Sequence, residues 1–105
     1  MTDKRLEARR QRSAALFNNR YFAECAVHVL SLSGGGQDMF TVRQVASASG
    51  LADSLVRPVL LRFCDAHVVE KLPRLGAGRS PQYLRAVDVD LLRWVALDGD
   101  LVSRK

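Results

Sequence analysis

The fold is decided by one stretch, FTVRQVASASGLADSLVRPVLLRFCDAHVVEKL, which covers residues 40–72. Its first part predicts a short helix that Thr41 can cap, because apolar residues recur at the three-and-four spacing of one helix face: Val42, Val45 and Ala46. Gly50 is expected to end that helix, since glycine reaches the left-handed backbone conformation without a steric clash. Leu51 can then enter the crevice between this helix and the next. The stretch therefore predicts two helices joined by a sharp turn.

The second helix is predicted to begin with Asp53 or Ser54 as its cap. Its buried stripe is expected from residues spaced four and three apart: Val56, Leu60 and Phe63. The outer face is then left to Ser54, Leu55, Arg57, Pro58, Leu61 and Arg62. Pro58 lacks a backbone donor and is expected to bend the first turns. His67 stands at the end of this helix, where a glycine would be more comfortable.

Two short strands are predicted after this helix, over residues 68–75 and 82–87, joined by a Gly-rich loop that carries Arg79. Residues 39–41 are expected to add a third short strand. Residues 40–87 resemble the winged helix-turn-helix of bacterial transcription regulators. The resemblance rests on Gly50-Leu51, Val56, Leu60, Phe63, the Val68-Val69 strand and the loop over residues 76–80. It implies a mainly α fold with a small β-hairpin, in which the second helix reads DNA and the hairpin is a wing.

Length and composition predict one soluble domain over residues 1–105, with an apolar fraction of 48% and 26% charged residues. Its expected parts are an N-terminal basic and dimerisation helix over 1–32, a Gly-rich, mobile linker over 33–38, the helix-turn-helix and wing over 39–87, and a C-terminal helix and tail over 88–105. No apolar run approaches the roughly 20 residues that cross a bilayer, and the N-terminus is charged where a signal peptide is apolar. A cytoplasmic protein is expected.

Both terminal helices are predicted to carry apolar faces that pack on the core and on a second copy. In the first helix one face is expected to hold Ala14, Phe17, Tyr21, Cys25 and His28, with Leu16, Phe22, Ala26, Val29 and Leu30 beside it. Asn18-Asn19 can interrupt that helix. In the last helix, which Asp88 caps and Gly99 stops, the inner side is expected to hold Leu91, Leu92, Val95 and Ala96, with Trp94 in the core or the dimer interface. A homodimer is expected through residues 14–30 and 89–97.

The charge distribution favours a polyanionic partner. The net charge is +5, and residues 40–87 carry seven basic and three acidic side chains, whereas residues 88–105 carry three and four. Lys and Arg neutralise phosphates independently of sequence, so double-stranded DNA suits this surplus. Two alternatives to a nucleic-acid partner stay open. The protein can be an ordinary soluble protein with a high pI, and the basic face of the first helix can be solvated.

The candidate DNA contacts divide by their chemistry. Ser54 and Arg57 lie where base edges are read, and arginine can bond guanine with two donors. The expected phosphate or wing contacts are Arg43, Arg62, Arg74, Arg79 and Ser80, with Arg79 also suited to the minor groove. Leu55, Pro58 and Leu61 on the same face can offer DNA only contacts with thymine methyl groups. This outer face therefore has a second interpretation, as a protein-interaction surface.

Other functions are disfavoured by the sequence. Two pairs spaced three apart, Cys25/His28 and Cys64/His67, could together hold zinc, but zinc sites usually place one pair on a tight loop, so no metal is expected. The three glycines at residues 34–36 lack the strand and the Gly-Lys-Ser/Thr of a phosphate-binding loop, so no nucleotide or other cofactor is expected. No nucleophile has a base in a recognisable motif, so an enzyme is not expected. The leading hypothesis is a sequence-specific, homodimeric DNA-binding transcription regulator.

Overall fold

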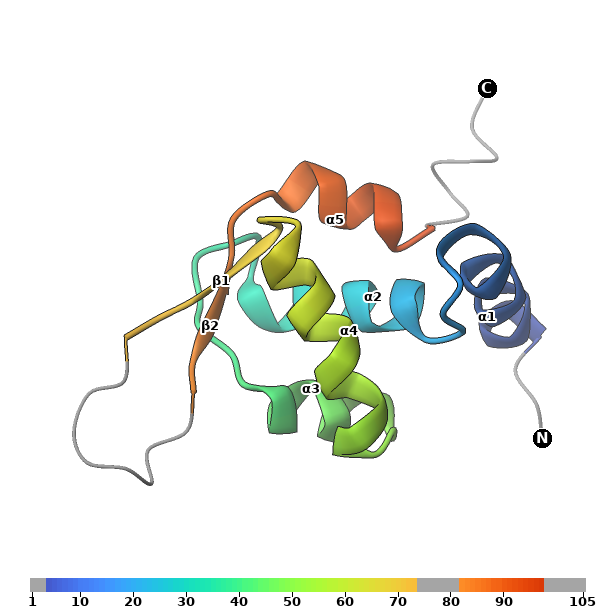
Figure 1. The fold of residues 1–105 in the computed structure, drawn as a ribbon, viewed down its shortest axis with the longest axis horizontal. Helices are drawn as coiled ribbons and strands as arrows, with labels where there is room; N and C mark the ends of the chain where they lie inside the picture. The colour runs from blue at the N-terminus through green and yellow to red at the C-terminus, as the bar shows by residue number, and fades with distance from the viewer. Residues whose placement is uncertain (1–3, 74–81, 98–105) are drawn as a thin grey trace.

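The protein is mainly helical with a small antiparallel sheet, as a computed structural model that describes residues 4–73 and 82–97 shows (Figure 1). The elements in chain order are α1 (Lys4–Phe17), α2 (Phe22–Ser33), α3 (Val42–Ser49), α4 (Asp53–Asp65), β1 (Val69–Lys71), β2 (Leu84–Ala86) and α5 (Val89–Val95). The predicted combination of helices with a small pair of strands is confirmed. No helix in these residues is long and apolar enough to cross a membrane.

The predicted N-terminal helix is two helices, α1 and α2. Asn18 takes a left-handed backbone conformation with φ 55°, and the side-chain oxygen of Asn19 accepts a hydrogen bond from the Tyr21 amide at 2.9 Å. The expected interruption at these asparagines is confirmed. The single apolar face predicted across it is wrong, because Ala14 and Leu16 are exposed. The break changes the helical phase, so the face of α1 cannot be extrapolated from that of α2.

Helix α2 is the centre of the molecule and contacts α1, α3, α4, α5 and β2 (Figure 1). Its fully buried apolar side chains are Ala23, Cys25, Ala26 and Val29. Phe22 joins them, with its ring centroid 4.9 Å from that of Phe17 and 4.8 Å from that of Phe63. Because this apolar surface is used within one protomer, most of the dimer surface expected over residues 14–30 is not available to a second copy.

The glycine-rich linker predicted over residues 33–38 begins one residue later, because α2 extends to Ser33, and it forms a tight turn. The Ser33 carbonyl accepts hydrogen bonds from three successive amides, those of Gly36, Gln37 and Asp38, at 3.0, 2.8 and 2.8 Å. Gly36 has φ 99°, and a Cβ there would lie 3.1 Å from a methyl of Val89. The turn therefore brings the chain close against α5.

Helices α3 and α4 are joined at Gly50, as predicted. Gly50 has φ 75°, and its amide donates to the Ala46 carbonyl at 2.9 Å, which closes the end of α3. Leu51 is half-buried against the core. The caps expected for α4 are wrong, because Ala52 occupies the capping position and makes no side-chain bond. Asp53 and Ser54 are instead the first helical residues.

Helix α4 continues through Pro58 and ends at Asp65, and His67, just beyond the capping residue Ala66, takes a left-handed conformation with φ 62°. The predicted stripe is confirmed, because Val56, Leu60 and Phe63 are buried. Val59 is buried as well. The remaining face of α4 is directed away from the core.

The sheet is formed by β1 and β2, whose paired residues are Val69 with Ala86, Glu70 with Arg85 and Lys71 with Leu84. Both strands are shorter than predicted. Phe40 adds one antiparallel bridge to Leu84, with hydrogen bonds of 2.9 and 2.7 Å, so the expected third strand is a single bridge. The predicted loop tip and its Arg74, Arg79 and Ser80 lie outside the described residues.

Helix α5 begins as expected, since the Asp88 carboxylate accepts a hydrogen bond from the Leu91 amide at 3.0 Å. Leu92, Val95 and Ala96 are buried, whereas Leu91, predicted on the inner side, is exposed. The helix is only two turns long, and its core-facing stripe is too narrow to include Leu91. The stop expected at Gly99 lies outside the described residues.

Candidate nucleic-acid interface

The arginines of α1 are largely used to hold the fold. Arg10 forms a two-pronged ion pair with Glu24 of α2, with Nε–Oε1 at 2.6 Å and Nη2–Oε2 at 3.0 Å. Glu24 is only 3% exposed, so this pair joins the two helices in a mostly water-free setting. The hydrogen bond to Glu24 raises the pKa of Arg10 above its usual value. The Arg10 guanidinium also lies 5.1 Å from the centre of the Tyr21 ring.

Two more α1 contacts tie this helix to the rest of the chain. Arg9 donates from Nε to the Ala96 carbonyl at the end of α5, at 2.9 Å. The buried hydroxyl of Ser13 donates to the Asn19 carbonyl at 2.6 Å and accepts from the Ala23 amide at 3.0 Å. The exposed pair of Arg20 with Glu7, at 2.9 Å, adds a surface link. Few arginines of α1 are therefore left for the alternative to a solvated basic face, in which this helix contacts phosphates.

Arg62, a predicted phosphate contact, is engaged by its own chain. Its Nη1 donates to the carbonyl of Phe17 at the end of α1, at 3.4 Å, and its guanidinium lies 4.6 Å from the centre of the Phe22 ring. A cation suits the negative end of a helix dipole. Arg62 thus stabilises the junction of α4 with α1 and α2.

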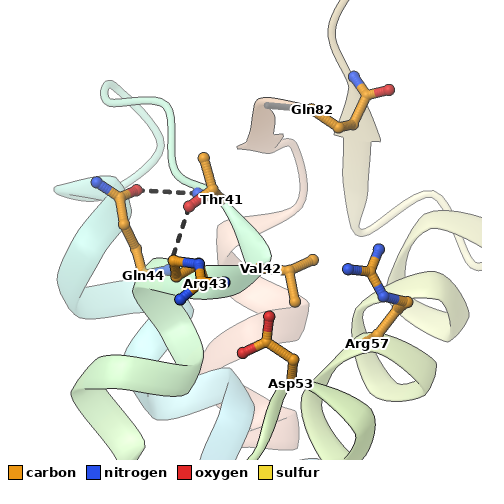
Figure 2. Close-up of a pocket in the computed structure, with 7 residues that line it drawn as sticks. All are labelled: Thr41, Val42, Arg43, Gln44, Asp53, Arg57 and Gln82. Carbon is orange, nitrogen blue, oxygen red and sulfur yellow. Dashed lines mark hydrogen bonds between the residues drawn. The ribbon is translucent and has the colours of Figure 1, made fainter. Parts of the chain in front are cut away.

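A pocket of about 440 Å³ opens where the start of α3, the start of α4 and the beginning of the second strand segment meet (Figure 2). Its lining residues are Thr41, Val42, Arg43, Gln44, Asp53, Arg57 and Gln82. A second pocket of about 140 Å³ shares Val42, Arg57 and Gln82 with it and continues between α4 and the sheet, along Leu60, Leu61, Cys64, Lys71 and Leu84. We call the two together the α3–α4 groove.

The start of α3 is fixed by a capping box. The Thr41 hydroxyl accepts from the Gln44 amide at 3.1 Å, and the Gln44 side-chain oxygen accepts from the Thr41 amide at 2.9 Å (Figure 2). The amides of Val42 and Arg43 precede the first intrahelical hydrogen bond, so they remain as donors at the positive end of the helix dipole. This arrangement favours an anion at the groove.

Arg43 and Arg57 line the groove from α3 and α4, and both are exposed. Within residues 4–73 and 82–97, neither forms an ion pair or a hydrogen bond through its side chain. Arg57 stands four residues after Asp53, a spacing that permits pairing on a helix, yet the two form no ion pair. The groove therefore presents two uncommitted guanidinium groups and Lys71 beside one carboxylate.

The outward face of α4 carries the other predicted contacts. Ser54, Leu55, Pro58 and Leu61 are exposed there, with Leu55 at 42% and Leu61 at 43%. Of the eight predicted DNA contacts, Arg43 and Arg57 thus meet at the groove, whereas Ser54 and Leu55 are exposed on α4 outside its lining. Arg62 lies at the α1 junction.

The two Cys/His pairs do not meet. Cys25 is fully buried, and burial raises the pKa of its thiol to about 12. Cys64 is half-buried in the groove, where burial also raises its pKa. Burial lowers the pKa of His28. In the described part of the chain, no three His, Cys, Asp or Glu side chains are placed to hold a metal ion together.

Sequence reasoning missed several groove residues: Thr41 as a groove-lining residue, Gln44, Lys71 and Gln82. The signal for Gln44 was available in the spacing Thr41-x-x-Gln44, which is that of a capping box. Lys71 and Gln82 reach the groove only through the pairing of two strands, which no local pattern reveals.

Comparisons of the chain with protein-family models, with curated proteins and with solved structures found no match.

Proposed function

We propose that the protein is a DNA-binding transcription regulator of the winged helix-turn-helix kind, which acts as a homodimer. The observation that carries this proposal is the pair Arg43 and Arg57, uncommitted at a groove where the start of α3 also favours an anion. Most of the other described arginines contact a carboxylate or a carbonyl of the chain, although Arg12 on α1 is exposed in the same way as Arg43 and Arg57. Two neighbouring cations that have no carboxylate partner among the described residues suit an anionic partner.

The order of the elements supports the same proposal. A helix (α2), a bridge at Phe40, two helices joined at a left-handed glycine (α3, α4) and a pair of strands follow one another as in a winged helix-turn-helix. In this assignment α4 enters the major groove, while the start of α3 and Arg43 approach the phosphate backbone. The loop between β1 and β2 would be the wing, on the backbone or in the minor groove.

The homodimer is supported by the face of α5. Trp94 is 76% exposed, and two further apolar side chains near it are exposed as well: Leu91, one turn earlier on α5, and Val87, which precedes the helix. An antiparallel pairing of two α5 helices centred near Leu91 would place Val87 opposite Trp94 of the second copy and Asp88 opposite Arg93. Such a surface is self-complementary, as a two-fold interface requires. Figure 1 places α5 on the side of α2 opposite α3, so this pairing would leave the α3–α4 groove open.

The proposal is tested by binding to duplex DNA of random sequence at low and moderate salt. Binding should weaken steeply, with a slope of log K against log salt of about −0.9 for each phosphate neutralised. Light scattering on the same sample should give a dimer for the wild type and a monomer for Trp94→Ser. A protein that ignores duplexes even in dilute buffer would refute the DNA-binding proposal, and a wild-type monomer would refute the dimer.

A second function is favoured by the apolar side chains on α4. Leu55, Pro58 and Leu61 could bind another protein through an apolar contact. Such binding would depend little on salt, because it neutralises no phosphates. The salt slope therefore separates the two functions.

A further inference from the structure

The outward face of α4 carries an apolar stripe made of Leu55, Pro58 and Leu61, all of them exposed. Residues three apart on an α-helix advance by about 300°, so the stripe crosses the outward face obliquely. One flank of the stripe adjoins Arg57 and the α3–α4 groove, and the other adjoins Arg62 at the α1 junction. An apolar stripe thus lies between two cations.

We propose that this stripe contacts thymine methyl groups in the major groove and gives the protein a preference for thymine-rich sites. The inference rests on the proposed DNA-binding function and specifies what α4 would recognise. Among the groups that base pairs present in the major groove, the thymine C5 methyl is the apolar one. Leucine and proline side chains have no donor or acceptor to offer the base edges, so methyl contact is the discrimination available to them.

The dimensions and charges of the stripe fit a DNA site. Leu55 and Leu61 are six residues apart, or about 9 Å along the helix axis, which corresponds to roughly three base steps of 3.4 Å. Arg43 and Arg57 both line the groove, where Arg43 can hold a phosphate while Arg57, beside the stripe on α4, can reach a base edge. Asp65 stands at the last residue of α4 and disfavours phosphates there, whereas Asp53 lines the groove and offsets one of its two arginine charges. The charges therefore place the backbone along the groove flank and the bases over the stripe.

The test begins with enrichment of bound duplexes from a random pool. Enriched sites should contain thymines in neighbouring positions. Replacing those thymines by uracil removes only the methyl groups and leaves the phosphates and base pairing unchanged. Affinity should fall about fourfold for each methyl contacted, the value expected for one apolar carbon withdrawn from water.

Variants then connect the methyl effect to the stripe. In Leu61→Ser and Leu55→Ser the ratio of thymine-duplex to uracil-duplex affinity should approach one. Leu16→Ser removes a comparably exposed leucine from α1 and should keep the wild-type ratio. Because each variant is judged by this ratio, a general change in stability or dimerisation cancels.

The outcomes separate this inference from the proposal beneath it. A protein that binds no duplex at low salt refutes the DNA-binding function itself. Binding to DNA with no thymine enrichment, or with equal affinity for thymine and uracil duplexes, overturns the thymine inference alone. An unchanged ratio in both stripe variants would also overturn it, as would salt-insensitive capture of a protein that competes with DNA for the stripe.

Discussion

Most arginines of the α1–α2 half contact another group of the chain, whereas two of the three arginines of the α3–α4 half form no side-chain hydrogen bond or ion pair with the described residues. In the first half Arg10 and Arg20 each have a carboxylate partner, and Arg9 has a carbonyl partner. In the second half Arg43 and Arg57 have no side-chain partner among the described residues and line a groove. The residue type is the same, so the difference lies in what surrounds it.

The surroundings differ in where the acidic side chains point. Glu24 lies on the face of α2 that meets α1, and its burial forces it to pair with Arg10. Asp53 lies in the α3–α4 groove with Arg57, but water reaches both side chains, so the gain from pairing is small. Buried charge therefore fixes the architecture, while exposed charge remains available to a partner. Each variant below should affect one half and spare the other.

The largest effect is expected from Glu24→Ala. It leaves the Arg10 guanidinium without its partner in a mostly buried setting, and the free energy of unfolding should fall by about 3 kcal/mol. Urea unfolding followed by circular dichroism measures the change. The matched control is Glu7→Ala, which breaks the exposed pair with Arg20 and should cost under about 0.5 kcal/mol. Equal losses in the two variants would show that burial does not distinguish the pairs.

The next effect is expected from Arg57→Ala, which should lower affinity for an enriched duplex about tenfold, the loss of one arginine contact to a base. Sequence preference should relax, and stability should stay within about 0.5 kcal/mol of wild type, because Arg57 has no internal partner. Fluorescence anisotropy measures the affinity. Arg20→Ala removes the same charge outside the groove and serves as the control. If Arg20→Ala lowers DNA affinity as much as Arg57→Ala does, Arg57 contributes to binding only through the net charge of the protein.

The α3–α4 half was largely predictable from the sequence because its determinants are local. The spacing of Val42, Val45 and Ala46, the left-handed Gly50 and the stripe of Val56, Leu60 and Phe63 are all properties of neighbouring residues. Arg43 and Arg57 followed as outer positions of those helices. The groove between them could be foreseen only in part, since Lys71 and Gln82 reach it through strand pairing.

The α1–α2 half was less predictable because its determinants are tertiary. Arg10 and Glu24 are far apart in sequence and meet only after the chain reverses at Asn18. The apolar pattern was extended through that break, which misplaced Ala14 and Leu16. Arg62 is exposed, as its outer position predicts, but its contact with the Phe17 carbonyl at the end of α1 joins residues 45 apart in the sequence. The spacing of apolar residues along one helix does not indicate which distant residues that helix will contact.

A smaller effect is expected in the reactivity of the two cysteines. Burial raises the pKa of both thiols, to about 12 for fully buried Cys25, whereas Cys64 is half-buried in the groove. Iodoacetamide at alkaline pH should therefore alkylate Cys64 slowly and Cys25 only on unfolding. Bound duplex DNA should slow the reaction of Cys64 further. Mass spectrometry of the two cysteine peptides measures both rates, and a Cys64 rate that DNA leaves unchanged would place the bound duplex away from the groove.

The smallest effect is a pH dependence that belongs to the α1–α2 half. Burial lowers the pKa of His28 below its ordinary value of 6.5, and the positive charge of Arg9 lowers it further, while Glu24 opposes both. Well above pH 6.5 His28 is neutral in the folded and unfolded chains and contributes no pH dependence. As the pH falls below that value, the unfolded chain takes up the proton first, so the free energy of unfolding declines until the folded protein is protonated as well. His28→Gln should flatten this decline between about pH 6.5 and 5, before most carboxylates titrate. Because His28 lies on α2 and not in the groove, the same variant should bind DNA like the wild type at each pH, and a parallel loss of DNA affinity would mean that the two halves are coupled.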